Sequence, residues 1–232
     1  MILGGLQKTT LIDFPGKIAA TVFTSGCNFF CGWCYSSELV TPEKIKKHPI
    51  IPEQEVLAFL ESRKGLLEGV VICGGEPTLQ KDLPEFIKKI KDMGFLVKLD
   101  SNGSNPAMLD NLINDKLIDY VAMDIKTFKE NYFSVLNGKV VVDDIQKSID
   151  ILKNSGIDYE FRTTVVPTIH EKEDFIKIAQ WIGGPDIKYY LQKFRGEKTI
   201  DPSFEKIKSY PDSWFLELKK EISQFFKICE IR

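Results

Sequence analysis

The chain has 232 residues, of which 43% are hydrophobic and 28% are charged, and its formal net charge is −2 with a pI near 5.8. These proportions exclude a disordered chain, and no apolar run is long enough to span a membrane. The weak negative charge gives no electrostatic reason to expect nucleic acid as the main partner. The N-terminal segment lacks the basic start, apolar core and cleavage site of a signal peptide, so we expect a cytoplasmic protein.

Short β-branched runs alternate with amphipathic helical patterns, which is typical of βα units around a parallel sheet. The predicted strands are Ile18–Thr24, Gly69–Cys73, Phe95–Leu99, Tyr120–Asp124, Tyr159–Val166 and Ile187–Gln192. The predicted helices are Gln54–Arg63, Leu83–Asp92, Pro106–Asn114, Val142–Asn154, Glu171–Trp181 and Ser213–Phe226, with Cys229–Arg232 as a short strand or tail. Six βα units are too few for a closed eight-stranded barrel. We therefore expect one α/β domain over residues 1–232, a partial (β/α)6 barrel open on one side, in preference to a doubly wound sheet.

Three of the five cysteines lie within eight residues, directly after the first predicted strand. An odd number of clustered cysteines is a poor disulfide framework and a better ligand set for a reducing compartment. Cys27, Cys31 and Cys34 have the spacing C-x₃-C-x₂-C, which lets one loop hold three irons of a [4Fe–4S] cluster and leaves the fourth iron open. The alternatives are a zinc site completed by Cys73 or His48, or three thiols without a metal.

Polar residues also follow the next three predicted strands, where the carboxyl ends of parallel strands place functional groups. The second strand ends in Gly74-Gly75-Glu76-Pro77, whose glycines permit close approach of a ligand and whose carboxylate accepts hydrogen bonds from an ammonium group. The third ends in Asp100-Ser101-Asn102-Gly103, and the fourth in Asp124-Ile125-Lys126. Each also has an ordinary interpretation: a β-to-α turn, an Asn-Gly turn and a surface ion pair, respectively.

Cys27, Cys31, Trp33 and Cys34 form a C-x₃-C-x-aromatic-C pattern that resembles the radical S-adenosylmethionine superfamily. The resemblance implies that the three cysteines bind the cluster, and that the open iron binds the methionyl group of S-adenosylmethionine. One electron then splits the cofactor into methionine and a 5′-deoxyadenosyl radical.

The other motifs resemble the cofactor-binding elements of the same family. The resemblance implies that Gly74, Gly75 and Glu76 hold the methionyl amine, that Asp100, Asn102 and Asp124 lie near the cofactor and a monovalent cation, and that Lys126 approaches the methionyl carboxylate as a catalytic group. Trp33, Cys34 and Tyr35 are the remaining predicted cofactor contacts.

The whole pattern is most similar to activating enzymes of glycyl-radical enzymes, in particular those of anaerobic ribonucleoside-triphosphate reductase. That similarity implies hydrogen abstraction from a glycine of a partner protein, with a flavodoxin or ferredoxin as electron donor. Tyr35-Ser36 departs from the His-Asn that follows the third cysteine of pyruvate formate-lyase activators. The alternatives are a radical enzyme acting on a small nucleoside precursor or pterin, similar to 7-carboxy-7-deazaguanine synthase, and a non-catalytic zinc-binding partner protein.

Several residues keep two interpretations. Asp13 belongs either to a substrate-binding entrance or to an Asp-x-Pro-Gly turn, and Arg162 either reaches the pocket or pairs with Glu160. Gln192 stands at the end of the sixth predicted strand, where the resemblance implies a cofactor-contacting loop with a histidine, and Gln192 is the candidate substitute for that histidine. His48 and His170 do not match that position. Cys73 and Cys229 are expected to be buried small hydrophobic residues.

Overall fold

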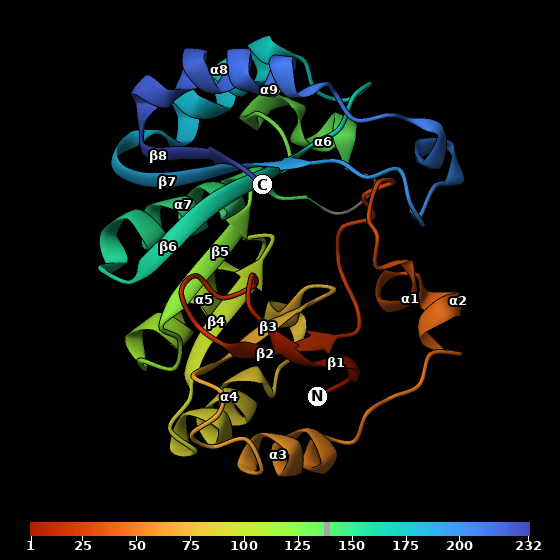
Figure 1. Cartoon of the computed structure of the whole chain (residues 1–232), viewed down its shortest axis with the longest axis vertical. Helices are drawn as coiled ribbons and strands as arrows, with labels where there is room; N and C mark the ends of the chain where they lie inside the picture. Colours follow the sequence, from red (N-terminus) through yellow and green to blue (C-terminus); the bar gives the residue numbers. More distant parts are fainter. Residues whose placement is uncertain (137–139) are drawn as a thin grey trace.

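The computed structural model describes residues 1–136 and 140–232, and within them eight strands form one mixed sheet in the order β1 to β8. The strands are β1 (Leu3–Thr10), β2 (Ala19–Thr24), β3 (Gly69–Gly74), β4 (Leu96–Ser101), β5 (Tyr120–Asp124), β6 (Asp158–Val165), β7 (Gly184–Lys193) and β8 (Phe226–Ile231). β1 is antiparallel to β2, and every later neighbour pair is parallel. β1 and β8 are the two edges, so the predicted partial barrel with an open side is confirmed (Figure 1).

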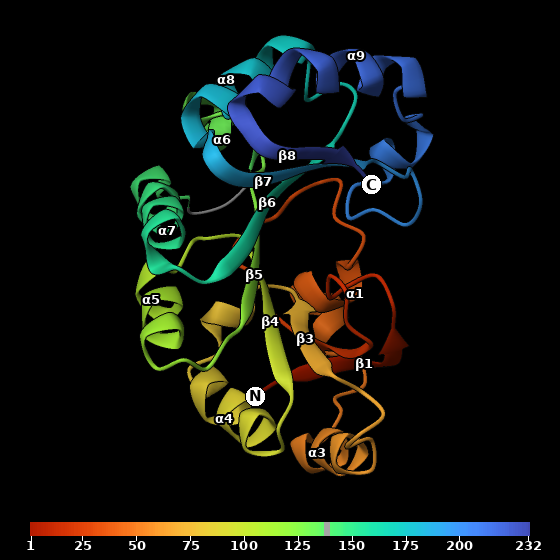
Figure 2. The same cartoon turned by 60° about the vertical axis from the view of Figure 1, so that its left-hand side comes forward.

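Helices connect the parallel strands and cover the outer face of the curved sheet (Figures 1 and 2). The α-helices are α1 (Ser37–Val40), α2 (Pro42–Ile45), α3 (Glu53–Glu61), α4 (Leu83–Asp92), α5 (Pro106–Asn114), α6 (Tyr132–Val135), α7 (Val142–Ser155), α8 (Lys172–Ile182) and α9 (Asp212–Ile222). Short 3₁₀ turns are η1 (Pro77–Leu79), η2 (Lys129–Asn131), η3 (Pro202–Lys206) and η4 (Ser223–Phe225). No helix among the described residues is both long and apolar enough to cross a membrane.

The two faces of the sheet differ in chemistry. The outer side chains, such as Val70, Ile72 and Leu99, are fully buried in one large apolar core with the helices. Because side chains alternate along a strand, the intervening residues point to the concave face. That face has only a small apolar cluster, which includes Val71 and Tyr120. Beyond this cluster the concave face carries charged and polar side chains, and these build the site.

The structure corrects two details of the predicted elements. β1 was not predicted, because Gly4 and Gly5 weaken its β propensity and Gln7-Lys8-Thr9 are exposed. The last predicted helix was too long: α9 ends at Ile222, and Phe226 already begins β8, which extends the predicted Cys229–Arg232 strand. Gly94 and Gly156 follow α4 and α7 with φ of 91° and 72°, the left-handed conformation in which glycine ends a helix.

Candidate functional site

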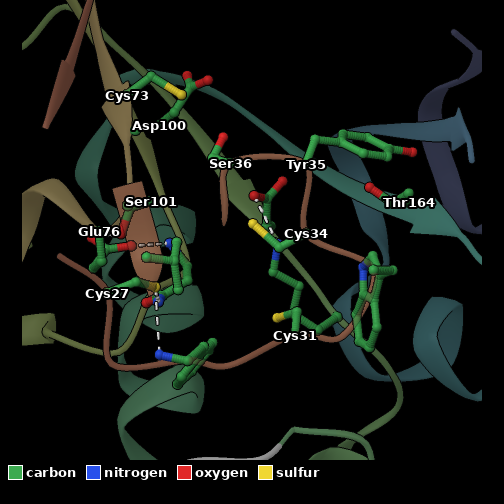
Figure 3. A pocket seen from close by; sticks show the side chains of 18 of the residues that line it. Cys27, Cys31, Cys34, Tyr35, Ser36, Cys73, Glu76, Asp100, Ser101 and Thr164 are labelled. Carbon is green, nitrogen blue, oxygen red and sulfur yellow. Dashed lines mark hydrogen bonds and ion pairs between the residues drawn. The ribbon is translucent and has the colours of Figure 1, made fainter. Parts of the chain in front are cut away.

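The loops after β2, β3, β4 and β5 surround a cavity of about 180 Å³ at the carboxyl edge of the sheet (Figure 3). All the predicted cofactor-site residues line it: Cys27, Cys31, Trp33, Cys34, Tyr35, Gly74, Gly75, Glu76, Asp100, Asn102, Asp124 and Lys126. We call this space the cofactor cavity. The structure thus brings the predicted residues together, and their roles as ligands stay predictions.

The cysteine loop is held at both ends by backbone hydrogen bonds. Gly26, with a φ of 102°, donates its N–H to Leu39 O at 2.7 Å, and the Cys34 N–H donates to Cys31 O at 3.0 Å. The loop is also tied to the chain after β7, because the Ile200 N–H donates to Cys34 O at 3.0 Å. These bonds shape the loop in which the three cysteines line one cavity.

The three thiols line one cavity together and offer the donor atoms that iron–sulfur clusters use, in a largely buried setting. Burial raises the pKa of Cys27 and of Cys31 to about 12, and it also raises that of Cys34, although the charge of Lys126 opposes each shift. Thiols of this kind release their protons when metal binds, and thiolates are the ligands of iron–sulfur clusters. The three side chains therefore fit the cluster that the sequence predicts.

The zinc alternative needs a fourth ligand near the thiols. Within the part of the chain that the structure describes, no three His, Cys, Asp or Glu side chains form a group suited to a single metal ion. Cys73 lines the cofactor cavity, and burial raises its pKa to about 12. His48 lies elsewhere, with its Nε2 2.6 Å from the Gly4 carbonyl oxygen.

Glu76 is buried at the centre of the site and joins the ends of β3 and β4. Its Oε1 accepts from the Thr78 N–H at 3.1 Å, the Thr78 hydroxyl at 2.5 Å and the Ser101 hydroxyl at 2.9 Å. Its Oε2 accepts from the Asn102 N–H at 2.6 Å. Burial raises the pKa of Glu76 although these donors oppose the shift. One oxygen is therefore saturated by the protein, and Oε2 keeps capacity for a further donor.

A chain of alternating charges crosses the ends of β4, β5 and β6. Arg162 donates from Nε to Asp124 at 2.6 Å and from a terminal nitrogen to Asp100 at 2.9 Å. Lys126 donates to Asp124 at 3.0 Å, and Lys98 pairs with Asp100. Asp124 and Lys126 therefore form an ion pair, but they line the cofactor cavity and do not lie on an open surface.

The ion pairs shift the pKa values of the two aspartates and of Lys126. Burial alone would raise the pKa of Asp100 and Asp124, but the charge of Arg162, helped by Lys98 and Lys126, lowers both. Burial would likewise lower the pKa of Lys126, and Asp124 raises it. The shifts of Asp100, Asp124 and Lys126 all favour the ionised forms of these side chains.

The predicted alternative pairing of Arg162 with Glu160 is wrong. Glu160 accepts two hydrogen bonds from the Arg232 guanidinium, at 2.7 and 3.0 Å, and one from the Tyr120 hydroxyl at 2.9 Å. The reason is register: Arg162 lies directly beside Asp124 across the β5–β6 pair, whereas Glu160 lies one step deeper in the barrel.

Sequence reasoning missed two residues that position Lys126. The Lys126 N–H donates to the Tyr132 hydroxyl at 3.0 Å, and His170 Nε2 lies 2.8 Å from Lys126 O. Because His170 Nδ1 accepts the Val166 N–H at 3.0 Å, Nε2 must carry the proton and donate. His170 also packs edge-on against Trp33, with ring centroids 6.4 Å apart. The only sequence signal for either residue was the presence of a histidine with no predicted role.

A second, wider cavity of about 790 Å³ shares Tyr35, Asp100, Arg162 and Thr164 with the cofactor cavity. We call it the outer cavity. Asp13 and Gln192 line it, so the structure places both away from the cysteines. Asp13 accepts a hydrogen bond from the Thr21 hydroxyl at 2.8 Å.

Tyr35 forms part of the wall between the two cavities. Its ring stacks on Phe194, with centroids 6.1 Å apart, and its hydroxyl accepts the Arg195 N–H at 2.7 Å. Tyr35 therefore joins the cysteine loop to the chain that follows β7.

Comparison with known proteins gives one family. The model of the Radical SAM superfamily matches residues 21–182. A Methanocaldococcus jannaschii protein provisionally named as a glycyl-radical enzyme activating enzyme is 32% identical over 100% of this chain and 95% of its own length. A second protein of that organism with the same provisional name is 31% identical over 82% of this chain and 72% of its length.

Solved structures agree at the level of the fold. The structure of Streptococcus suis SuiB bound to S-adenosylmethionine superposes with a TM-score of 0.65 at 16% identity. It covers 91% of this chain, and this chain spans about half of SuiB, 51%. The cysteine loop, the fold and these matches together place the chain in the radical SAM superfamily, to which it belongs.

Proposed function

We propose that this radical SAM enzyme generates a glycyl radical on a partner protein, and that the partner is an anaerobic ribonucleotide reductase. The observation that carries the proposal is the similarity to the provisionally named activating enzyme, which runs through the whole chain at 32% identity. A reduced flavodoxin or ferredoxin is the proposed electron donor, and the chain is proposed to act as one cytoplasmic domain.

The residues of the cofactor cavity fit the two groups that the family implies. Cys27, Cys31 and Cys34 would hold the [4Fe–4S] cluster. Glu76 Oε2 and the Lys126 ammonium offer an acceptor and a donor for the amine and carboxylate of S-adenosylmethionine. When bound, the cluster and S-adenosylmethionine supply the one-electron chemistry for hydrogen abstraction.

The protein itself contributes orientation and the exclusion of water. Glu76, Asp100 and Asp124 are each fixed by at least two hydrogen bonds or ion pairs, so their positions do not depend on the ligand. Phe29, Cys31 and Trp33 are buried and give one wall of the cavity an apolar character. Such a wall protects a reactive radical from solvent.

The outer cavity supports a protein substrate over a small one. Its volume of about 790 Å³ is wide enough for several residues of an extended chain, and it meets the cofactor cavity at a shared wall. A loop carrying the target glycine would enter there, next to Asp13 and Gln192. The proposed role of these two residues is contact with that loop.

The test is formation of a glycyl radical. The chain is reconstituted with iron and sulfide without oxygen, reduced, and incubated with S-adenosylmethionine and an anaerobic ribonucleotide reductase. We expect about four irons per chain and a glycyl doublet in the electron paramagnetic resonance spectrum. Replacement of the partner's glycine by alanine removes the doublet.

Matched cysteine variants separate the alternatives. Cys31→Ala should lose iron, whereas Cys229→Ala, which alters an equally buried thiol in β8, should keep it. Zinc binding without iron would support the non-catalytic alternative. Cofactor cleavage without any glycyl radical, together with turnover of a pterin or nucleoside precursor, would support the small-molecule alternative.

A further inference from the structure

Two carboxylates line the cofactor cavity on either side of Arg162, and one of them, Asp100, also lines the outer cavity. Asp100 lies at the end of β4 and is buried, and Asp124 lies at the end of β5 and is half-buried. Arg162 of β6 lies between them and lines both cavities. Two carboxylates that share one site repel each other, and a cation bonded to both favours the ionised form of each.

The cation between them is the guanidinium, and it uses one oxygen of each carboxylate. Arg162 Nε reaches Asp124 Oδ1 at 2.6 Å, and a terminal nitrogen reaches Asp100 Oδ2 at 2.9 Å. The other two oxygens are also paired: Asp124 Oδ2 meets Lys126 at 3.0 Å, and Asp100 Oδ1 meets Lys98. All four carboxylate oxygens therefore have a cationic partner.

A monovalent metal ion shared by Asp100 and Asp124 would have to bind through their oxygen atoms, in the space between the two carboxylates. The guanidinium of Arg162 already lies there, bonded to both, and supplies the positive charge that such an ion would bring. Arginine remains charged at every physiological pH, so its charge is permanent. The residues present do not fit the monovalent cation that the sequence resemblance implies.

We propose that Arg162 is the built-in cation of this site, and that the chain binds its cofactor without a monovalent metal ion between Asp100 and Asp124. Arg162 is a positioning residue: it fixes Asp124, which in turn holds the Lys126 ammonium at the cofactor cavity. The proposal rests on the cofactor site of the proposed function and does not depend on the identity of the partner protein.

The test uses the full chain, with and without its reconstituted cluster, in potassium, sodium or N-methylglucamine chloride at equal ionic strength. The melting temperature and the dissociation constant of S-adenosylmethionine are measured in each salt. For the natural chain we expect the same values in all three salts. A saturable shift specific to potassium or sodium would overturn the proposal, whatever the variants do.

The second part of the test uses the variant Arg162→Ala. It removes the partner of Asp100 Oδ2 and of Asp124 Oδ1 and leaves a space between them. In N-methylglucamine we expect cofactor affinity to fall by about tenfold or more, since a charge-assisted pair is lost. Potassium, sodium or added guanidinium should restore part of that affinity. They should also raise the melting temperature by roughly 3 °C at tenfold excess over the dissociation constant.

Two further variants serve as controls for the Arg162→Ala measurements. Arg162→Lys keeps a cation between the carboxylates and should stay independent of the salt. Arg232→Ala removes another arginine of the concave face, but one that pairs with the single carboxylate of Glu160, so its melting temperature should not respond to potassium or sodium. An Arg162→Ala protein that folds and shows no cation response, or a response equal to that of Arg232→Ala, would contradict the proposal. Absence of a glycyl radical with every partner would leave these results unchanged and would count only against the proposed function.

Discussion

Glu76 is a single residue whose carboxylate hydrogen bonds hold the backbone of the site in place. The Thr78 and Asn102 N–H groups donate to different oxygens of this side chain, so both oxygens are needed as acceptors. An amide has only one oxygen. Glutamine at this position would therefore leave one buried backbone donor facing an NH₂ group.

We expect Glu76→Gln to lower the free energy of unfolding by about 1–3 kcal/mol, the usual cost of an unsatisfied buried donor. Urea unfolding of the metal-free chain measures this loss. Glu61→Gln, on the exposed end of α3, should change stability little. Equal effects of the two substitutions would contradict the assigned role of Glu76.

His170 gives the site a pH dependence. Burial lowers its pKa below the ordinary value of 6.5, although the Lys126 carbonyl and Asp174 oppose the shift. The unfolded chain therefore binds the proton more readily than the folded chain. Stability is full above pH 6.5 and falls as the pH drops below it.

We expect His170→Gln to be less stable than the natural chain at pH 7.5, because the hydrogen bonds to Lys126 and Val166 are lost or weakened. The difference should narrow by pH 5.5, where the natural chain has lost part of its own stability. Unfolding free energies at the two pH values check this. A gap that stays constant or widens would mean that His170 does not titrate as inferred.

At the scale of elements, the turn after β3 packs directly on the start of the cysteine loop. The Gly75 N–H donates to Thr24 O at 2.9 Å, and the Glu76 N–H donates to Gly26 O at 2.8 Å. A Cβ at Gly75 would lie 2.0 Å from Gly26 O. Two backbones meet there, so no side chain is available to move aside.

We expect Gly75→Ala to displace the cysteine loop and to reduce iron loading on reconstitution, with a lower melting temperature. Gly184→Ala, on β7, is the matched control, because its Cβ would meet only the Ile187 side chain at 3.3 Å. Iron content per chain is the measurement. Full iron loading of Gly75→Ala would show that this contact does not shape the loop.

Much of the site was predictable because its residues are local features of strand ends. The cysteine spacing and the glycine–glutamate turn can be read within a few residues, and parallel strands bring their carboxyl ends to one edge. The pairing of Arg162 could not be read in this way. Alternation along β6 turns it inward, but the choice between Asp124 and Glu160 depends on the register with β5.

Contacts between residues far apart in the chain could not be predicted from the sequence either. β1 is held by pairing with β2 and not by its own propensity, and the Tyr35–Arg195 hydrogen bond joins residues 160 positions apart. Likewise, His170 reaches Lys126 across 44 residues. Patterns of a few residues carry no information on such contacts, which follow from the curved path of the whole sheet.

At the scale of the whole molecule, the turn between β1 and β2 borders the outer cavity and exposes apolar side chains. Leu11 is 71% exposed and Ile12 84%, and Ile12 lines the cavity beside Asp13. Exposed apolar residues beside a cavity are typical of surfaces that bind a protein. Under the proposed function, this turn is the expected contact with the partner protein.

We expect the double variant Leu11→Ser/Ile12→Ser to raise the KM for the partner protein by about fivefold or more, as for an interface residue worth ~1 kcal/mol. Cofactor affinity should be unchanged. Leu216→Ser on α9, where Leu216 is 61% exposed, is the control and should leave KM unchanged. Steady-state formation of the glycyl radical measures both. An unaltered KM in the double variant would remove this turn from the interface.

The position of Trp33 has a practical consequence. Its indole is buried within the cysteine loop, between Cys31 and Cys34, and packs 6.2 Å from Phe204. The other two tryptophans lie on helices α8 and α9. With Trp181→Phe and Trp214→Phe, the remaining tryptophan fluorescence would come from the cysteine loop alone. Cluster insertion, and its destruction by oxygen, would then be visible in real time as quenching and recovery of a single natural fluorophore.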